Sequence, residues 1–364
     1  MNIALFSPNK NPYSETFIQA HKELLPGKVH YYYGDKKGLW LENHKVNLVA
    51  KTALDIFKKK FSKSNDFKKW NRLKKSVKAN SIDVILVEYG NHAHELLPLL
   101  TSLEIPFVVH FHGYDATVDY VLKQTSNYRQ VFETAAAIIA VSKVMYDKLI
   151  NLGCPENKLH YNVYGPSDHF SMLTANISKP QFIAVGRFTD KKAPYFTILA
   201  FAKAQKAFQD ATLVMVGNGA LLDTCMNLVS YLKLEESVIF AGVKTPQEVS
   251  DLMSSSRAFV QHSITAQNGD QEGTPLSVLE ASATGIPVIA TRHAGISDVV
   301  QHGVTGLLCD ECDVDTMATH MIELLEQPDK AKAMGTQGKE RIKTHFSMDR
   351  HIDALYEILT AARG

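Results

Sequence analysis

Two glutamates, Glu272 and Glu280, lie either side of a Gly-Thr-Pro turn in the segment QEGTPLSVLEASATGIPVIA, residues 271–290. Thr274 followed by Pro275 predicts a helix start, with the threonine as cap and the proline in the first helical position, and Gly285 predicts the helix end. Glu280 is the only charged residue between them. An unpartnered buried carboxylate is costly, so Glu280 needs either a protein cation or the hydroxyls of a ligand.

A cluster of cations follows the apolar run QFIAV in the segment GRFTDKK. Gly186 turns the chain, and Arg187, Lys191 and Lys192 place three positive charges close to the end of an expected strand. Such a cluster suits a diphosphate.

A glycine pair follows the next apolar run, ATLVMV. Gly217 and Gly219, with Asn218 between them, would let the backbone approach a ligand closely. The pattern is not GxGxxG, and a tight turn without a ligand explains the glycines equally well.

The run PFVVHFHGYD brings His110, His112 and Asp115 to the end of another expected strand. We expect these side chains in a crevice, with His110 on the opposite strand face as a core or wall residue. A lone histidine is more often structural than catalytic.

Short apolar runs alternate with amphipathic segments throughout the chain, which predicts parallel sheets wrapped by helices. We expect two doubly wound, Rossmann-like α/β domains, residues 1–165 and 181–345, joined by a linker over 166–180. A last helix within 346–364 has apolar spacing at Ile352, Leu355, Ile358 and Leu359, and is expected to pack on the first domain. Ligands of such sheets bind at the carboxyl ends of the strands. The expected strands are 2–6, 28–33, 83–89, 106–112, 136–142, 158–164, 181–186, 211–217, 237–242, 258–263, 287–291 and 305–309.

Composition narrows the class of protein further. The 364 residues carry a net charge of +1, which argues against a protein that binds nucleic acid through a large overall positive charge. No run of 18 apolar residues exists, and the start MNIALFSPNK is too short and polar for a secretory signal. The chain is therefore expected to be cytoplasmic, with its four cysteines reduced.

Taken together, these motifs resemble glycosyltransferase family 4, whose members are retaining enzymes of the GT-B fold, in which two such domains face each other across a cleft. The resemblance rests on the E-x7-E spacing in EGTPLSVLEASATGIPVIAT, the downstream AGISDVVQHGVTGLL, and the segments GRFTDKK, VGNG, VIFAG and AVSKVMYDKLINLGCPENKLHYNVYG. The segments SETF and HGYD are similar to the bacterial exopolysaccharide and lipopolysaccharide branch.

The resemblance implies roles for the second domain, which would bind the nucleotide sugar. Arg187 and Lys192 would hold the donor diphosphate, Glu280 the ribose hydroxyls, and Glu272 the sugar. The alternative is that the carboxylates are satisfied by local arginines such as Arg292. The full set of implied donor residues is Gly186, Arg187, Lys192, Gly217, Asn218, Gly219, Val243, Glu272, Gly273, Thr274, Pro275, Leu276 and Glu280.

For the first domain, the resemblance implies an acceptor side. His112 would lie near the anomeric carbon, so that His112, Glu272, Arg187 and Lys192 form the implied catalytic set. Ser14, Glu15 and Thr16 are expected to cap the next helix and to face the acceptor, together with Asp115. The loop SPNKNPYSETFI departs from the glycine pair common in the family.

No metal or other cofactor is expected, because Arg187 and Lys192 would neutralise the leaving diphosphate. Cys309 and Cys312 have a metal-knuckle spacing but no second pair. Asp313 and Asp315 imitate an Asp-x-Asp metal motif, yet they open an expected helix and are interpreted as its cap.

Residues 51–78 hold eleven Lys or Arg against two Asp, interleaved with apolar residues. A basic amphipathic helix is typical of attachment to an anionic membrane surface, and a solvated helical face is the equal alternative.

The sequence thus predicts a retaining, metal-independent hexosyltransferase of bacterial surface-glycan synthesis, cytoplasmic or peripheral at the inner face of the plasma membrane. Its expected donor is a nucleotide diphosphate sugar, UDP-sugar rather than GDP-mannose, and its acceptor a glycan or lipid-linked glycan. The alternatives are a nonhydrolysing sugar-nucleotide epimerase and an inactive scaffold that binds nucleotide sugar.

Overall fold

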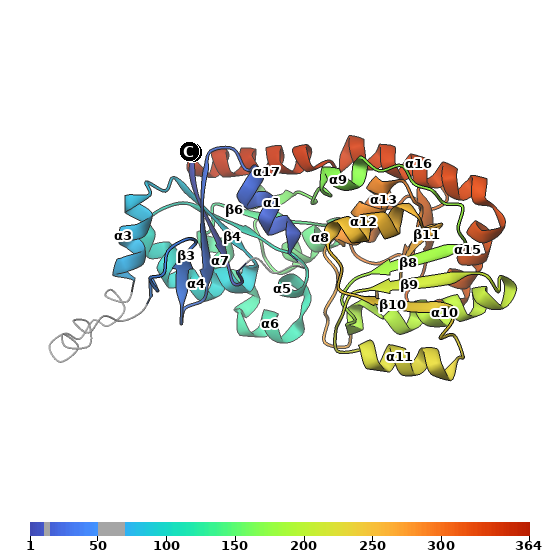
Figure 1. Ribbon diagram of the computed structural model, residues 1–364. Coiled ribbons are helices and arrows are strands. Elements are labelled where there is room, and N and C mark those ends of the chain that lie inside the picture. The colour runs from blue at the N-terminus through green and yellow to red at the C-terminus, as the bar shows by residue number, and fades with distance from the viewer. Residues whose placement is uncertain (11–14, 50–69) are drawn as a thin grey trace. The chain divides into compact units, whose positions relative to one another are not determined.

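The computed structural model describes residues 1–10, 15–49 and 70–364 (Figure 1). It divides into two compact units, each with its own sheet. Residues 1–141, 146–162 and 352–364 form the first unit, and residues 142–145 and 163–351 form the second. The second unit therefore takes in the stretch 166–180 that was expected as a linker, and this stretch carries helix α9 (Asp168–Ser171).

The first unit is built on a seven-stranded sheet in the order β3-β2-β1-β4-β5-β6-β7. All neighbouring strands are parallel except the pair β2 and β3. The three-residue β3 was not predicted, because it is too short to show a period. The strands are β1 (Asn2–Ser7), β2 (Lys28–Gly34), β3 (Leu39–Leu41), β4 (Val84–Glu88), β5 (Phe107–His110), β6 (Ala137–Ala140) and β7 (Leu159–Tyr161).

Helices cover this sheet between the strands, as the sequence pattern predicts. They are α1 (Thr16–Leu24), α3 (Asn71–Ala79), α4 (Gly90–Leu103), α5 (Tyr114–Thr117), α6 (Asp119–Gln124), α7 (Arg129–Thr134) and α8 (Lys143–Asn151), with short 3₁₀ turns at Ser126–Tyr128 and Glu156–Lys158.

The second unit has a six-stranded, wholly parallel sheet in the order β10-β9-β8-β11-β12-β13. Its strands are β8 (Gln181–Val185), β9 (Thr212–Val216), β10 (Val238–Gly242), β11 (Ala258–Gln261), β12 (Val288–Thr291) and β13 (Gly306–Cys309). Its further helices are α10 (Pro194–Ala207), α11 (Leu222–Tyr231), α12 (Pro246–Ser254), α13 (Leu276–Thr284), α14 (Ile296–Val299), α15 (Val314–Glu326) and α16 (Pro328–His345), with a 3₁₀ turn at Asp190–Lys192. Two doubly wound α/β sheets are therefore confirmed.

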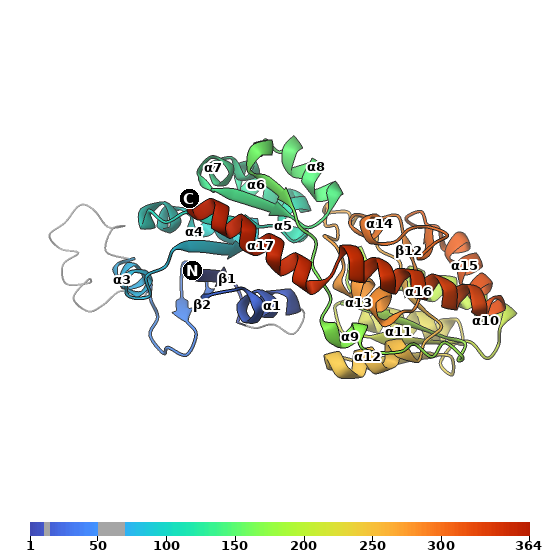
Figure 2. The same ribbon diagram turned by 90° about the horizontal axis from the view of Figure 1, so that it is seen from above.

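Helices lie on both faces of the second sheet. In Figure 1, α10 and α11 lie on one side of β8–β10, and α12 and α13 lie on the other. Figure 2 shows α16 running beside α13, and the two helices are in contact. The main core of this unit joins Phe201 of α10, Met215 of β9 and Met321 of α15, each at most 2 % exposed. Such burial holds the strand ends in fixed positions, since each large apolar side chain contributes about 1.5–3 kcal/mol.

The last helix, α17 (Met348–Arg363), buries the apolar positions that the sequence singled out. Ile352, Leu355, Ile358 and Leu359 are all at most 9 % exposed, and residues 352–364 belong to the first unit. The predicted periodicity is confirmed.

Of the basic segment 51–78, residues 51–69 lie outside the described residues, among them Lys58, Lys59, Lys60, Lys68 and Lys69. The described part is Trp70 and α3, where Leu73 and Val77 are buried and Arg72, Lys75 and Lys78 are exposed. Here the apolar side of the helix is already packed on protein. Among the described residues, no helix is long and apolar enough to cross a membrane.

Candidate active site

In the second unit, the strand order reverses beside β8, which pairs with β9 on one side and β11 on the other. Ligands of open parallel sheets bind outside the strand ends at such a point. Arg187 and Lys192 follow β8, and Glu272 lies in the loop between β11 and α13. The fold thus gathers the cations and the first glutamate at one place.

Lys192 and Glu272 form an ion pair, with 3.0 Å between Nζ and the carboxylate oxygen Oε1. Lys192 Nζ also donates to Gln261 Oε1 at 3.4 Å. Burial would raise the pKa of Glu272, but the positive charges of Lys192 and Lys191 outweigh it and hold the pKa at about 2. Glu272 is therefore a carboxylate at any ordinary pH.

Lys191 points elsewhere. Its side chain is buried, and Nζ contacts Asp270 at 2.9 Å and the carbonyl of Gln271 at 3.1 Å. The three-cation cluster read from the sequence is therefore two cations, Arg187 and Lys192, with Lys191 holding the loop that leads to Glu272. Arg187 itself is exposed.

Glu280 has no such partner. Among the described residues, none forms a hydrogen bond or an ion pair with its carboxylate, and the attraction of Lys192 only partly offsets burial, which raises its pKa to about 7. Arg292, the alternative partner weighed from the sequence, donates instead to the carbonyl of Leu308 at 2.6 Å. A partly buried carboxylate is thus left without a contacting cation among the described residues, which favours a ligand.

The helix between the glutamates begins one residue later than predicted. Its N-cap is Pro275, whose ψ of 121° is extended, and no side chain caps it. The expected Thr274 cap was therefore wrong. Gly285 at φ 93° ends the helix as predicted. The first amides of α13, from Leu276 onward, receive no side-chain cap that would compete with a ligand.

The glycine pair has a structural reason of its own. A Cβ on Gly217 (φ +132°) would lie 2.0 Å from the carbonyl oxygen of Gly186, and one on Gly219 would lie 2.5 Å from that of Phe188. Hydrogen bonds from Gly186 N to Val216 and from Phe188 N to Asn218 join the two loops. Contact between loops therefore explains both glycines, and their approach to a ligand stays a prediction.

A histidine missed in the sequence supports the glutamate loop. The backbone N–H of Glu272 donates to His293 Nε2 at 3.1 Å, and His293 Nδ1 lies 2.6 Å from Glu311 Oε1. Glu311 also accepts from the backbone N–H of Thr265 at 2.8 Å. These bonds fix the backbone at Glu272.

At the end of β10, Val243 is 50 % exposed. The nearest carboxylate along the chain, Glu248, is held by the Thr245 capping box and by Lys244. Hydrogen bonds from Thr245 and Lys244 lower the pKa of Glu248 to about 2.

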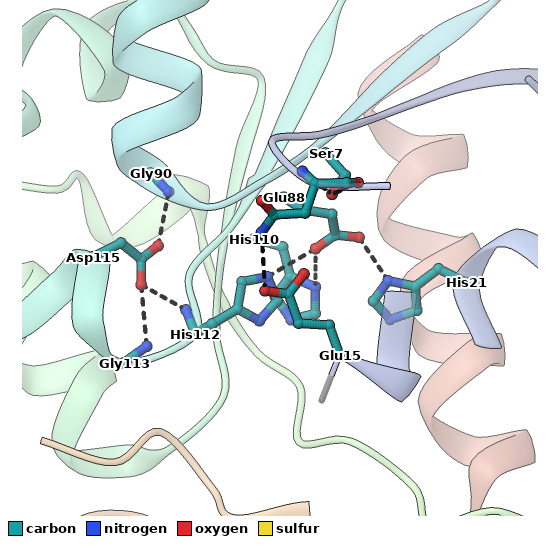
Figure 3. A network of polar contacts seen from close by, with 10 residues as sticks. Ser7, Glu15, His21, Glu88, Gly90, His110, His112, Gly113 and Asp115 are labelled. Carbon is teal, nitrogen blue, oxygen red and sulfur yellow. Dashed lines mark hydrogen bonds and ion pairs between the residues drawn. The ribbon is translucent and has the colours of Figure 1, made fainter. Parts of the chain in front are cut away.

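In the first unit, the strand order reverses between β1 and β4, and a histidine cluster lies at this point (Figure 3). Glu88, the last residue of β4, is fully buried between His21 of α1 and His112, with contacts of 2.6 Å to His21 Nδ1 and 2.8 Å to His112 Nε2. Glu88 and His21 were not predicted from the sequence. The available signal was a carboxylate at the end of the apolar run VILVE.

His110 belongs to the same cluster. Its Nδ1 lies 3.5 Å from Glu88 Oε2, and its ring centroid lies 4.5 Å from that of His112. The expectation of opposite faces was wrong, because residues two apart share one side of an extended chain. Both rings turn towards Glu88.

Asp115 bonds to backbone amides. It is fully buried, and its two oxygens accept from the backbone N–H groups of Gly90 (2.7 Å), His112 (2.9 Å) and Gly113 (3.1 Å). Asp115 thus holds the His-Gly turn against the start of α4, and its place on the acceptor side stays a prediction.

Of the three residues expected to cap α1, Ser14 lies outside the described residues and Thr16 is exposed. Glu15 is in the N-cap position but makes no capping bond. Instead it bonds to Tyr89 and Asn9, while burial raises its pKa. Tyr89 has a φ of 71°, unusual for a bulky residue, and its ring lies 4.5 Å from that of His112. Such strain is typical of functional sites.

The discounted metal motifs have structural explanations. The Asp313 side chain accepts from the Thr316 backbone N–H at 2.9 Å and caps α15 as predicted, while Asp315 pairs with Lys203. Cys309 is buried, whereas Cys312 is exposed. Among the described residues, the cluster His21, Glu88 and His110 has a composition that could hold a metal ion.

Comparison with known proteins identifies the family. The model for glycosyltransferase family 4 matches residues 27–161, and that for glycosyl transferases group 1 matches residues 168–341. The chain therefore belongs to glycosyltransferase family 4.

Its curated relatives include two proteins of bacterial exopolysaccharide synthesis. The chain is 27% identical to the amylovoran biosynthesis glycosyltransferase AmsK of Erwinia amylovora, over 76% of this chain and 70% of that protein. It is 28% identical to the putative colanic acid biosynthesis glycosyltransferase WcaL of Salmonella typhimurium, over 65% of this chain and 60% of that protein. The chain thus spans less than two thirds of the latter's length.

Among solved structures, the chain is similar to Anabaena HepE in complex with UDP and glucose. The TM-score is 0.78 at 17% identity, covering 99% of this chain and 100% of that one. At this identity the likeness shows the fold, and it confirms GT-B.

The raised pKa of Glu280 predicts a pH-dependent cost to folding. The pKa of a glutamate in the unfolded chain is near its ordinary value of 4.5, whereas the pKa of the folded Glu280 carboxyl is about 7, so stability falls as pH rises between the two. Glu280→Gln removes this cost. We expect the free energy of unfolding to rise by about 1–3 kcal/mol at pH 8 and by less than about 1 kcal/mol at pH 5.

Thermal denaturation at both pH values measures this difference, with the exposed Glu326→Gln as control. Equal effects of Glu280→Gln at pH 5 and pH 8 would show that Glu280 is not destabilised by its surroundings.

Proposed function

We propose that the protein is a retaining glycosyltransferase that moves a sugar from a nucleotide diphosphate sugar to an acceptor hydroxyl in bacterial surface-glycan synthesis. The observation that carries the proposal is that Glu272 and Glu280 differ in their charge partners. Glu272 is ion-paired to Lys192, whereas Glu280 has only the distant attraction of that lysine. A vicinal pair of ribose hydroxyls would donate to Glu280 and satisfy it.

In this proposal, the diphosphate lies against Arg187, Lys192 and the uncapped start of α13. Exposed Arg187 can offer a bidentate fork, and the helix start adds partial positive charge and free N–H groups. The amides of Gly273 to Leu276 and the Glu272 carboxylate would bind the sugar hydroxyls. His293 and Glu311 hold the Glu272 backbone in place for this contact.

We favour a UDP-sugar over GDP-mannose as donor. A guanine base offers N–H donors that a carboxylate would recognise. At the end of β10, where the base is proposed to lie beside Val243, Glu248 is occupied by its own capping box.

The proposed reaction breaks the bond between the anomeric carbon and the phosphate oxygen and forms the new glycosidic bond on the same face. The departing phosphate oxygen takes the acceptor proton. The protein supplies orientation and stabilises the charge that develops on the leaving group, so the residues invoked need no metal. On the first unit, His112 would contact the sugar and Glu15 and Thr16 would lie nearer the acceptor, a glycan or lipid-linked glycan.

Two alternatives make different predictions for the donor alone. A nonhydrolysing epimerase would convert a nucleotide sugar without any acceptor, and an inactive scaffold would bind it unchanged in all conditions. Incubation of the protein with UDP-sugars, with and without a lipid-linked glycan acceptor, followed by NMR of the anomeric proton, separates the three. Transfer with an α-configured product from an α-configured donor supports the proposal.

We expect the two glutamates to act on different steps. Glu280→Gln weakens acceptance from the ribose, so donor affinity falls, and the wild-type loss of affinity below about pH 7 disappears in the variant. Glu272→Gln acts beside the carbon where positive charge develops, so turnover falls at unchanged donor affinity.

Calorimetry with a UDP-sugar and steady-state kinetics measure the two effects. A nucleotide sugar is the suitable probe because its diphosphate, esterified at both ends, does not titrate near neutral pH. If both substitutions changed only donor affinity, Glu272 would have no catalytic role.

We expect Arg187→Ala and Lys192→Ala to lower turnover by about a hundred- to a thousandfold, since each removes a donor to a developing oxyanion. Full activity should survive EDTA. Arg187→Ala is the cleaner variant, because Lys192→Ala also leaves Glu272 without its partner. Lys206→Ala, an exposed position on α10, is the control.

The competing account places a divalent cation at Asp313 and Asp315. It predicts that chelation stops transfer, that magnesium or manganese restores it, and that Asp313→Ala is severe. Those results would overturn the assignment of Arg187 and Lys192.

We further propose that the basic segment 51–78 attracts the protein to anionic membrane surfaces by charge. In α3, Leu73 and Val77 are packed inside, and the exposed residues include the cations Arg72, Lys75 and Lys78. Replacing Arg72, Lys75 and Lys78 with glutamine should weaken sedimentation with phosphatidylserine vesicles, by about 1 kcal/mol per charge at low salt. Unchanged sedimentation would make α3 a solvated face.

A further inference from the structure

Glu88 is the centre of a cluster of ionisable side chains in the first unit. The proposed binding of the nucleotide sugar by the second unit does not involve this carboxylate. Its carboxylate is fully buried, as are His21 and His110, whereas the His112 side chain is 5 % exposed. In Figure 3, the Glu88 oxygens point towards His21 on one side and towards the rings of His110 and His112 on the other. His112 is therefore the member of this cluster that reaches the surface.

The cluster holds Glu88 in its ionised form. Burial by itself would raise the pKa of Glu88. The neighbouring histidines outweigh burial and hold this pKa well below the usual range: first the electrostatic attraction of His21, then the hydrogen bonds with His112 and His21, and then the attraction of His110. The closest contact of this carboxylate is with His21, whose Nδ1 lies 2.6 Å from Oε1. One oxygen of Glu88 is thus engaged by α1.

The other oxygen determines the state of His112. An ionised carboxylate can only accept, so His112 Nε2, at 2.8 Å from Oε2, must carry the hydrogen. In the Nε2–H tautomer of a neutral imidazole, Nδ1 is the acceptor nitrogen. The Asp115 carboxylate accepts from the backbone N–H of His112. The rings of Phe17 and Tyr89 each lie 4.5 Å from the imidazole ring of His112, measured between centroids. Both the orientation and the tautomer of this ring are thereby fixed.

We propose that Glu88 is the positioning residue of His112, fixing the Nε2–H tautomer that sugar transfer uses, while His21 holds the other oxygen of Glu88. This inference rests on the proposed function, in which His112 contacts the sugar. Glu88 itself touches no substrate, and it acts through His112 alone.

Glu88→Gln tests this role, because it changes the hydrogen-bonding groups that face His21 and His112 and keeps the size of the side chain. A glutamine is the same size but has one acceptor oxygen and one donor NH₂. If the oxygen keeps accepting from His21 Nδ1, the NH₂ faces His112 and requires the opposite tautomer. We expect turnover to fall about a hundredfold or more, the scale of a general acid–base contribution, while UDP affinity stays unchanged.

Glu42→Gln is the matched control. Glu42 also pairs with α1, through Lys22 at 2.6 Å, but lies outside the histidine cluster. This change should leave turnover and UDP affinity as in the wild type. An equal loss in both variants would mean that α1 contacts matter only for folding.

Two readouts separate positioning from a structural role. In ¹⁵N-histidine NMR of the wild type, with His112→Ala used to assign the signals, His112 should show a protonated Nε2 without any substrate present. In kinetics, Glu88→Gln should cause no further loss in the His112→Ala background, because a residue that acts only through His112 is not additive with it.

The NMR arm does not depend on the enzyme activity, so it distinguishes failure of this inference from failure of the proposed function. A protonated Nδ1 on His112 in the wild type would overturn the inference even if transfer occurs and even if Glu88→Gln does not fold. So would an additive loss in the double variant. Stoichiometric, tight zinc binding that Glu88→Gln abolishes would also overturn it, since His21, Glu88 and His110 would then be metal ligands.

Discussion

One ammonium group faces two carboxylates in the second unit, and the donor site depends on this imbalance. Lys192 pairs with Glu272 at 3.0 Å and leaves Glu280 with attraction but no contact. The result is one glutamate with a pKa of about 2 and another with a pKa of about 7 on the two sides of a single helix start. Paired and unpaired carboxylates suit different tasks, and the proposed function assigns them the sugar and the ribose.

In the first unit, too, the partners of buried carboxylates decide what each carboxylate can do, but here the partners are imidazole rings and backbone amides. Glu88 is a single buried anion among three imidazoles, and Asp115 is an anion satisfied by three backbone amides. Asp115 fixes the backbone of the His-Gly turn, whereas Glu88 fixes a ring. In both units the charged groups lie at the point where the sheet order reverses, which is where parallel strand ends leave room for a ligand.

The sequence predicted the fold well because buried parallel strands are continuous apolar runs. All twelve expected strands are present, and within the part of the chain that the structure describes only the three-residue β3 was missed. A charge cluster close in sequence, Arg187, Lys191 and Lys192, was also visible. What the sequence could not show was which cation pairs with which anion: Lys191 points to Asp270, and Arg292 to a carbonyl. Partners far apart in sequence, such as His21 with Glu88 and His293 with Glu272, were likewise invisible.

The central claim is that a nucleoside diphosphate binds the second unit at Arg187, Lys192 and the start of α13. Hydrogen–deuterium exchange in the presence of EDTA tests it directly, because the first amides of α13 have no side-chain cap. The account predicts that UDP, but not uridine, slows exchange in peptides covering 186–192 and 273–280 and leaves 314–326 unchanged. Protection that is absent from the first two segments, or that appears at 314–326 only when magnesium is added, would contradict it.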